Sequence, residues 1–431
     1  MKICVALHSC MDLGGIINHT EQLIGGLKEL GHRVDFKELV YADRAQTMGK
    51  DGNFELGQSS IPFSQGKGWN FKAENRLAYK TTAGLRTAIQ ILNGYDMVIW
   101  TVPVPPKNRQ NLGNDRWPEL YDLKPNVKQV AFIHDGNCKA GAPHLLHILD
   151  KLSVLACVHA CALNGASHLA IPRALVVNPQ FMPIRDVQPW ENKRPGFVNM
   201  QTFKAWKHAH ELVEAIAYMP DRHPDELREI AGKGIEYQYM TSEDKCKPQY
   251  FHGSEEGIER WFDGMKFWEA AEANGMTHHD YWNTEQVNEY LTSARILVDP
   301  SWSAKYSQVG GHWNRVVVDA MINGCIPVAQ SRGMGDELFK DGQHYIDLDI
   351  ADGDPDLYAE IILEASHMTS SEAMLYRDEA RKILPMFDRV AVAQRLIDLA
   401  HGNVVTQTGV DDPLVRKKYE DLMFNQYGVL A

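Results

Sequence analysis

The chain alternates short apolar runs with longer segments whose apolar residues recur at helical spacing. In the first half, the run KICVALHS is followed by Gly14 and Gly15, by a helical pattern that stops at Gly31, and by a second apolar run at 32–42. This order predicts a strand, a glycine turn, a helix and a strand. Further strands are expected at 95–102, 127–134 and 173–179. Such alternation is typical of a parallel sheet covered on both faces.

A segment rich in proline and charge, residues 181–196, precedes a second series of the same kind. After FVNM the patterns predict a helix at 208–219, a strand at 235–240, a helix at 283–294, a strand at 295–301, a helix carrying Asp319, a strand from Ile326, and helices within 354–400. We therefore expect an α/β protein with two Rossmann-like parallel-sheet domains that face a cleft. Their predicted bounds are 1–185 and 186–400, with a tail, 401–431, that packs back on the first domain.

Length and composition agree with a large folded protein. A chain of 431 residues with 44% apolar and 23% charged residues is expected to form two cores. The N-terminus lacks the features of a signal peptide and no segment resembles a membrane span, so we predict a cytoplasmic protein without a membrane partner. The seven cysteines are scattered and odd in number, which indicates reduced thiols, and Cys157 and Cys161 are expected one turn apart on a helix.

Residues 299–330 carry the clearest chemical signal. A strand ends at Asp299-Pro300-Ser301, a glycine-rich turn contains Gly310 and Gly311, and a helix with the acidic Asp319 follows. An acidic residue on such a helix can accept both hydroxyls of a ribose, while backbone N–H groups and the helix dipole hold phosphates. This arrangement suits a nucleotide-sugar donor and indicates a glycosyltransferase. An ordinary strand-turn-helix of an α/β protein remains the alternative.

A net charge of −12 argues against a protein whose whole surface binds nucleic acid, but one segment is locally basic. Residues 67–86 carry five cations against one glutamate, interleaved with aromatic residues. We predict that Lys72, Arg76 and Trp69 contact an anionic acceptor; the alternative is a solvated helix face with its aromatic residues in the core. Neither HHD at 278–280 nor the acidic runs at 347–356 is expected to bind a metal ion.

Taken in order, these motifs resemble a family. The Gly-Gly turn, the His-Asp pair after an apolar strand, the basic residues at the start of the second domain, and PS…DAM…G…PV near the end are similar to retaining glycosyltransferases of the GT-B fold. The likeness covers about the first 350 residues. It implies an acceptor-binding first domain and a donor-binding second domain.

The resemblance assigns roles at matching positions. Gly14 and Gly15 would approach the donor diphosphate, and Lys207 matches the family's phosphate-binding lysine. The family's arginine position is Thr202 and its glycine position is His208, so Lys204 would supply the missing cation. Two solvent lysines at a helix start are the alternative.

The donor motif departs from the family at one position. Asp319 takes the place of the second glutamate of the family's Glu-x(7)-Glu, which binds ribose, and the first glutamate falls at Gly311, which cannot replace it. The pocket would instead be shaped by backbone amides and side-chain donors of Gly310, Gly311, Asn314 and Arg315.

Short segments such as LKPNVKQVAFIHDGNCK and GKGIEYQYM are similar to the phage α-glucosyltransferases that modify 5-hydroxymethylcytosine in DNA. This subgroup implies a nucleoside-diphosphate sugar as co-substrate, no other cofactor, no metal, double-stranded DNA as acceptor, and a phage protein in the host cytoplasm. His134 and Asp135 would act beside the acceptor hydroxyl, although a structural histidine and a turn are the alternative. Two other functions stay open: a glycosyltransferase with a small-molecule or glycan acceptor, and a nucleotide-sugar-binding protein without catalysis.

Overall fold

The computed structural model describes residues 1–8, 14–40, 75–104, 116–134, 145, 147–167, 169–180, 186–201, 207–231, 264–279, 282, 284–302, 311, 313–335 and 338–407. The chain forms two compact units, one comprising Met1–Phe181 with Phe387–Ala431 and the other Met182–Met386. No helix in the described ranges is long and apolar enough to cross a membrane.

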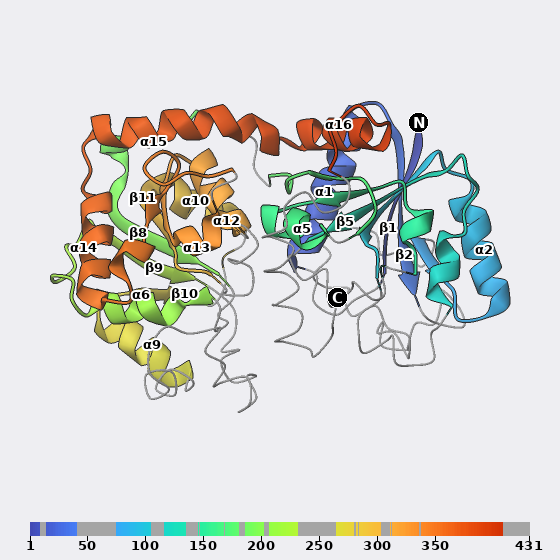
Figure 1. The fold of residues 1–431 in the computed structure, drawn as a ribbon. Helices are drawn as coiled ribbons and strands as arrows, with labels where there is room; N and C mark the ends of the chain where they lie inside the picture. Colours follow the sequence, from blue (N-terminus) through green and yellow to red (C-terminus); the bar gives the residue numbers. More distant parts are fainter. Residues whose placement is uncertain are drawn as a thin grey trace. The chain divides into compact units, whose positions relative to one another are not determined.

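The first unit contains a seven-stranded parallel sheet (Figure 1). In spatial order its strands are β3 (Arg76–Ala78), β2 (Arg33–Val40), β1 (Lys2–His8), β4 (Met97–Val102), β5 (Lys128–Ile133), β6 (Val154–Cys157) and β7 (Arg173–Leu175). From Ile3 to His8 every residue of β1 is buried, as expected for a strand covered on both faces. The strand order reverses between β1 and β4, and in sheets of this kind the carboxyl ends at such a point form the ligand site.

The helices of the first unit are α1 (Gly14–Glu29), α2 (Thr82–Leu92), α5 (Ala160–Gly165) and α16 (Arg389–Ala400), with 3₁₀ turns at Trp117–Tyr121 and Leu149–Lys151. The late helix α16 packs on α1. Gly26 permits this close approach, because a Cβ atom there would lie 2.1 Å from the backbone oxygen of Arg389. The chain beyond α16 reaches Gln407, which forms an isolated antiparallel bridge with Arg173; the remainder of the predicted tail lies outside the described residues.

The second unit contains a six-stranded parallel sheet with the same reversal of strand order. Its strands are β10 (Thr277–His279), β9 (Leu227–Ala231), β8 (Arg194–Met200), β11 (Ala294–Asp299), β12 (Ile326–Ala329) and β13 (Ile346–Asp347). Its helices are α6 (Ala209–Ile216), α9 (Gly264–Ala273), α10 (Thr284–Ser293), α12 (Arg315–Ile322), α13 (Ser331–Met334), α14 (Pro355–Ser366) and α15 (Ser370–Ile383), with 3₁₀ turns at Trp190–Asn192, Asp349–Ala351 and Leu384–Phe387. Both sheets have the 3-2-1-4-5-6 order of Rossmann-like domains.

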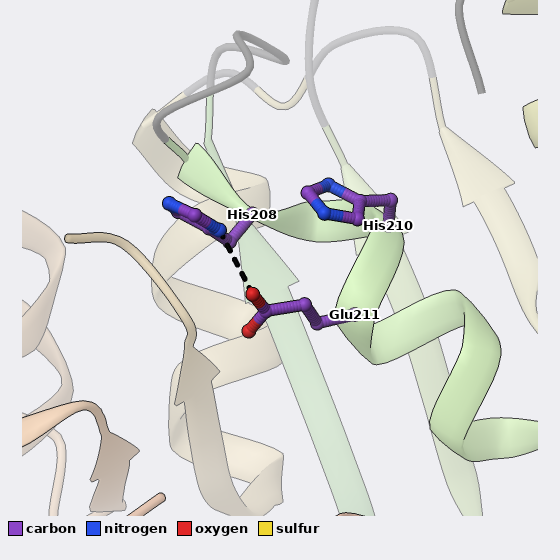
Figure 2. Close-up of side chains that lie close together, drawn as sticks. All are labelled: His208, His210 and Glu211. Carbon is purple, nitrogen blue, oxygen red and sulfur yellow. Dashed lines mark hydrogen bonds and ion pairs between the residues drawn. The ribbon is translucent and has the colours of Figure 1, made fainter. Parts of the chain in front are cut away.

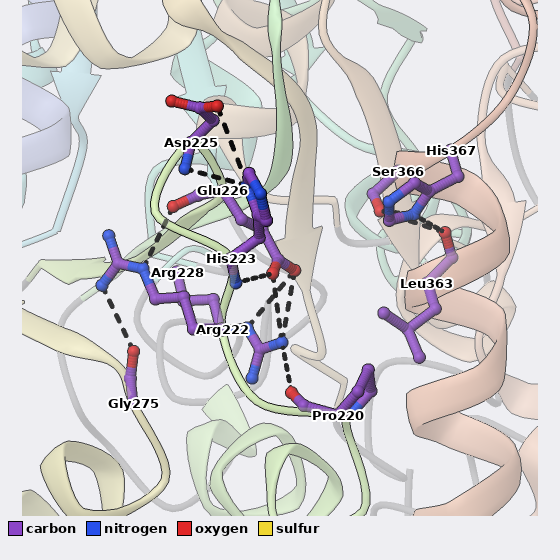
Figure 3. A network of polar contacts seen from close by, with 10 residues as sticks. All are labelled: Pro220, Arg222, His223, Asp225, Glu226, Arg228, Gly275, Leu363, Ser366 and His367. Carbon is purple, nitrogen blue, oxygen red and sulfur yellow. Dashed lines mark hydrogen bonds and ion pairs between the residues drawn. The ribbon is translucent and has the colours of Figure 1, made fainter.

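The core of the second unit lies between β8, β11 and β12 of the sheet and the helices α6 and α14 that pack together on it (Figure 1). Leu212, Val213 and Ile216 of α6 are almost fully buried, as are Tyr358 and Ile362 of α14. The loop from α6 to β9 is fixed by arginines: Arg222 donates to Gly275 O at 3.2 Å, and Arg228 donates to Pro220 O at 2.8 Å and contacts Glu226 (Figure 3).

Five of the described strands, β3, β6, β9, β10 and β13, were not predicted, and in two of them, β3 and β9, buried ion pairs interrupt the apolar pattern. In β3, Arg76 lies beside its register partner Glu38 of β2, with Nε 2.7 Å from Oε2. In β9, Arg228 and Glu229 are buried, and Glu229 pairs with Arg222 at 3.1 Å. The strand expected at 235–240 lies outside the described residues.

The prediction that Cys157 and Cys161 lie one turn apart on the same helix was wrong in part. Cys157 ends β6, whereas Cys161 belongs to α5. Both side chains are buried, and burial raises the pKa of Cys157 to about 12. Both cysteines are therefore core residues, and Cys157 is held as a neutral thiol.

Candidate functional site

The candidate donor site lies at the carboxyl ends of β8 and β11, where the strand order of the second sheet reverses. Lys207 precedes α6, the helix that follows β8, and Asn314 precedes α12, the helix that follows β11. Asp299 is the last residue of β11 itself. The topology of two βα units thus brings three residues that are far apart in the sequence to one edge of the sheet.

A chain of hydrogen bonds joins these three side chains. The Lys207 ammonium donates to Asn314 Oδ1. The Asn314 amide nitrogen donates to both carboxylate oxygens of Asp299, at 2.9 and 2.7 Å. Because a carboxylate only accepts hydrogen bonds, Asp299 fixes the orientation of the amide, and the amide oxygen must then face Lys207. Asp299 therefore holds the cation in place through Asn314.

This geometry corrects the predicted role of Asn314. Its side chain was expected to offer hydrogen-bond donors to the donor pocket, but its NH₂ group is engaged by Asp299. Ser301 extends the same network, since its hydroxyl lies 2.6 Å from Asp299 Oδ1 and 3.1 Å from Gln201 Oε1. Asn314 is thus a positioning residue for Lys207. Sequence reasoning noted Asp299 as the end of a strand but did not foresee this function.

The structure explains why position 311 cannot carry the family's glutamate. A Cβ atom on Gly311 would lie 1.9 Å from the backbone oxygen of Met334 and 2.6 Å from its carbonyl carbon. The obstacle is backbone rather than a flexible side chain, so it cannot move aside cheaply. Gly311 therefore packs directly on the end of α13.

Placing the family's glutamate at position 311 should destabilise the protein. We expect Gly311→Glu to lower the free energy of unfolding of the second unit by about 2–4 kcal/mol, because either the loop or α13 must move to remove the overlap. Urea unfolding monitored by intrinsic fluorescence would measure the change. Gly342→Ala provides a control for loss of glycine, since nothing lies within 4 Å of its Cβ position, although its φ of +70° adds some strain. An unfolding curve for Gly311→Glu equal to that of the native protein would contradict the proposed packing.

The other predicted donor residues of the second unit lie on α12. Asp319 is 7% exposed and sits about one turn after Arg315, which is half-buried and begins the helix. Asn323 donates its side-chain amide to the backbone oxygen of Asp319 at 2.9 Å. Lys204 and Gly310 lie outside the described residues. Of Gly14 and Gly15, the structure describes only that they open α1.

A second polar network lies directly after Lys207. His208 adopts the left-handed backbone conformation, with φ 51° and ψ 25°, at the position where the family has glycine. Its Nδ1 atom lies 2.9 Å from Glu211 Oε1, and the other oxygen of Glu211 accepts a 2.6 Å hydrogen bond from Gln330 (Figure 2). Sequence spacing could have indicated this pair, since residues three apart face each other at a helix start.

An aromatic stack holds the same imidazole from one side. The ring of His208 lies parallel to that of Trp302, with a centroid separation of 4.8 Å and an interplanar angle of 18°. Arg332 lies over the Trp302 ring at 4.2 Å and also pairs with Asp349 at 2.5 Å. The hydrogen bond to Glu211 and the stacking on Trp302 therefore fix the position and orientation of the His208 ring.

His208, His210 and Glu211 form a group that could meet a metal ion by proximity alone, since one ligand atom from each lies within 4.8 Å of the others. However, both oxygens of Glu211 already accept hydrogen bonds from His208 and Gln330. Burial lowers the pKa of His210 to about 4, with Glu211 opposing the shift. The arrangement is that of a carboxylate that orients an imidazole.

In the first unit, His134 follows β5 at the carboxyl edge of the sheet. Its Nε2 atom lies 2.9 Å from the backbone oxygen of Thr101, which must be an acceptor, so Nε2 carries the proton. The ring contacts His19 edge-on at 4.8 Å, and His19 is paired with Asn178 at 2.7 Å. Desolvation lowers the pKa of His134 to about 4, so the ring is neutral at pH 7. Asp135 lies outside the described residues.

The predicted acceptor contact of Arg76 is corrected by the structure. Its side chain is almost fully buried in β3 and is ion-paired with the equally buried Glu38. A guanidinium already neutralised inside the sheet does not offer its charge to a phosphate on the surface. Lys72 and Trp69 lie outside the described residues.

Two histidines of the first unit, the buried His8 and the partly buried His134, make its stability depend on pH. Desolvation lowers the pKa of His134 to about 4 and that of His8 to about 3, below the ordinary value of 6.5. The unfolded chain therefore binds more protons between these values, and stability falls as the pH falls from about 6.5 toward 4. We expect the unfolding free energy to be lower at pH 5 than at pH 7 by about 1–2 kcal/mol for each histidine. Urea unfolding at both pH values tests this, and His134→Gln should remove its share; an unchanged pH dependence would exclude burial of a neutral His134.

Comparisons with known proteins agree with this architecture. Residues 181–382 match the family model described as "Glycosyl transferases group 1". A search of curated protein sequences found no match.

Several solved structures have the same fold. An α-glucosyltransferase in complex with UDP-glucose and DNA containing an abasic site is similar over 93% of this chain and 99% of its own, with a TM-score of 0.61 and 12% identity. Anabaena Alr3699/HepE in complex with UDP-glucose is similar over 93% and 100%, with a TM-score of 0.57 and 14% identity. The lipopolysaccharide outer core galactosyltransferase WaaB is similar over 94% and 100%, with a TM-score of 0.55 and 12% identity.

At these identities the structural likeness establishes the fold alone. The two Rossmann-like sheets and the likeness to these structures show that the chain has the GT-B fold of glycosyltransferases, and residues 181–382, in its second unit, match the model of glycosyl transferases group 1.

Proposed function

We propose that this protein is a retaining glycosyltransferase that moves a sugar from a UDP-linked donor to the hydroxyl of a hydroxymethylated base in double-stranded DNA, without a metal ion. The hydrogen-bonded chain from Asp299 through Asn314 to Lys207 is the observation that carries the donor half of this proposal. It holds a cation at the carboxyl edge of a glycosyl transferases group 1 domain, where a diphosphate leaving group needs neutralisation.

Each donor-site residue has a distinct task in this proposal. Lys207 stabilises the negative charge that develops on the diphosphate as the glycosidic bond breaks. The first turn of α12 presents backbone N–H groups and the positive end of its dipole to the same anion. Asp319 accepts hydrogen bonds from the ribose hydroxyls. With cations and helix termini supplying the positive charge, the reaction has no need of a divalent metal.

His134 and Asp135 serve the acceptor in this proposal. In the neutral ring of His134, Nε2–H donates a hydrogen bond to the backbone oxygen of Thr101. Nδ1 is therefore the nitrogen that can accept a hydrogen bond from a hydroxyl. Asp135 follows directly in the sequence and would orient or deprotonate that hydroxyl.

DNA as acceptor is supported by two observations of different kinds. The sequence segments quoted above resemble phage DNA-modifying enzymes, and one solved structure of this fold is described as a complex with UDP-glucose and DNA. A base inside a duplex would have to leave the stack before its hydroxymethyl group could react.

A glycan acceptor is the second candidate. It is favoured by the likeness in fold to WaaB, which is described as a lipopolysaccharide galactosyltransferase, and by the burial of Arg76, which removes one of the cations expected to contact DNA. A nucleotide-sugar-binding protein without catalysis remains the non-enzymatic alternative.

One experiment separates these functions. The full-length protein is incubated with a panel of radiolabelled UDP-sugars and three acceptors: hydroxymethylcytosine DNA, the same DNA with plain cytosine, and no acceptor, each with and without EDTA. We expect label on hydroxymethylated DNA alone, unaffected by EDTA, and an α-linked product by NMR. Donor hydrolysis without transfer to DNA would favour a glycan acceptor, while binding without hydrolysis would favour the non-catalytic protein.

A further inference from the structure

The imidazole of His208 has one nitrogen whose function the fold does not explain. Its Nδ1 atom is paired with Glu211, whereas the buried Nε2 atom has no hydrogen-bond partner among the residues that the structure describes. Figure 2 shows the two nitrogens at opposite ends of the ring, with the second one directed away from Glu211. A buried polar atom without a partner is unfavourable, so this nitrogen is a candidate for contact with a ligand.

The surroundings of His208 suit an anion. The residue immediately follows Lys207 and lies at the N-cap of α6, an eight-residue helix whose positive dipole end is located there. The resemblance to GT-B enzymes implies two cations for the donor diphosphate, and the arginine position is Thr202 in this chain. Where the family has glycine, this chain has a residue that can carry a positive charge.

We infer that His208 is the second cation of the donor site, and that its Nε2 atom donates a hydrogen bond to an oxygen of the donor diphosphate beside Lys207. This inference rests on the proposed use of a UDP-sugar. Glu211 accepts from Nδ1 and orients the ring, and Trp302 fixes its plane.

The proposal requires a proton. Because Nδ1–H donates its hydrogen bond to Glu211, Nε2 carries a lone pair in the neutral ring. Nε2 must therefore gain a proton from solvent before it can donate a hydrogen bond to phosphate. The side chain of His208 has no exposed surface, so neighbouring groups must move before the donor can reach Nε2. Proton uptake should therefore accompany binding, and affinity should rise as the pH falls.

The other charged or titratable groups around the His208 ring are not expected to account for the proton uptake. Lys207 precedes it, and His210 and Glu211 share its helix. Arg332 lies over the Trp302 ring and is neutralised by Asp349. Burial, with a smaller contribution from the charge of Glu211, raises the pKa of the Tyr358 hydroxyl of α14 far above neutral pH, so this hydroxyl stays protonated.

Isothermal titration calorimetry with UDP tests the proposal, using buffers of different ionisation enthalpy at pH 7.5. His208→Gly is the matched variant, since φ 51° suits glycine, and the difference between the two proteins cancels the titration of UDP itself. We expect the native protein to take up about one proton more than the variant, and the variant to bind UDP about 10–100-fold more weakly. His208→Asn, which also tolerates this backbone conformation, should behave like glycine and replaces it if the glycine variant is unstable.

The outcomes are distinguishable. His223→Gln, an exposed histidine of the same unit, should bind UDP like the native protein. Equal affinity and equal proton uptake in native protein and His208→Gly would overturn the inference while leaving a UDP-dependent enzyme intact. Absence of UDP binding by the native protein would overturn both this inference and the proposed function.

Discussion

Replacing Lys207 with alanine should lower kcat/KM for sugar transfer by about 10²–10³-fold. Lys207 is the cation that the Asp299–Asn314 pair holds at the carboxyl edge of the second sheet, and loss of one charge-stabilising group of this kind costs about 2.7–4 kcal/mol. Because the charge on the diphosphate grows as the bond breaks, the loss should appear mainly in kcat. Steady-state transfer of labelled sugar measures both constants.

The control and the counter-result are equally specific. Lys382→Ala removes an exposed lysine of the same unit that pairs with Glu379, and it should leave kcat/KM unchanged. Lys207→Arg keeps the charge but changes its geometry and should recover part of the activity. If Lys207→Ala transferred sugar at the native rate, Lys207 would not stabilise the leaving group.

A double-mutant cycle tests how Lys207 is positioned. If Asn314 acts only through Lys207, then Asn314→Ala should lower kcat/KM in the native protein but have little further effect in Lys207→Ala. Independent, additive losses would instead indicate that Asn314 contacts the substrate itself.

Much of the fold could be predicted because most strands are continuous apolar runs. β1, β4, β5 and β11 are buried on both faces, so the local pattern alone indicates them. β3 and β9 were missed because each places arginine or glutamate inside a sheet, where the charge is tolerated through a partner that is distant in the sequence: Glu38 for Arg76 and His279 for Glu229. A single sequence does not state which charges will meet across strands.

The candidate site could be predicted in part, and the rest was missed because it depends on contacts between residues that are distant in the sequence. Lys207, Gly311 and Asp319 follow from a motif order that local spacing preserves. The function of Asp299 does not, because it acts through Asn314, fifteen positions away on the other side of a loop. The same is true of Trp302 and Gln330, which reach His208 and Glu211 only after the sheet has formed.

Arg76 shows how strongly such a distant partner changes the expected result of a mutation. On the surface, an arginine of the basic 67–86 segment would contribute to DNA binding and little to stability. In the structure, Arg76→Ala leaves the Glu38 carboxylate, which has no exposed surface, without its counter-charge. We therefore expect the unfolding free energy of the first unit to fall by about 3–5 kcal/mol.

Urea unfolding and DNA binding at several salt concentrations, measured on the same variants, decide between the two roles of Arg76. Arg86→Ala, an exposed arginine of the same segment, should leave stability within about 0.5 kcal/mol of the native value. Joint replacement by Glu38→Leu and Arg76→Met should recover much of the stability, because neither charge is then buried alone. A stable Arg76→Ala protein with a reduced salt dependence of DNA binding would instead return Arg76 to the acceptor surface, whereas loss of stability in the single variant and its recovery in the double variant would place its whole effect in the sheet.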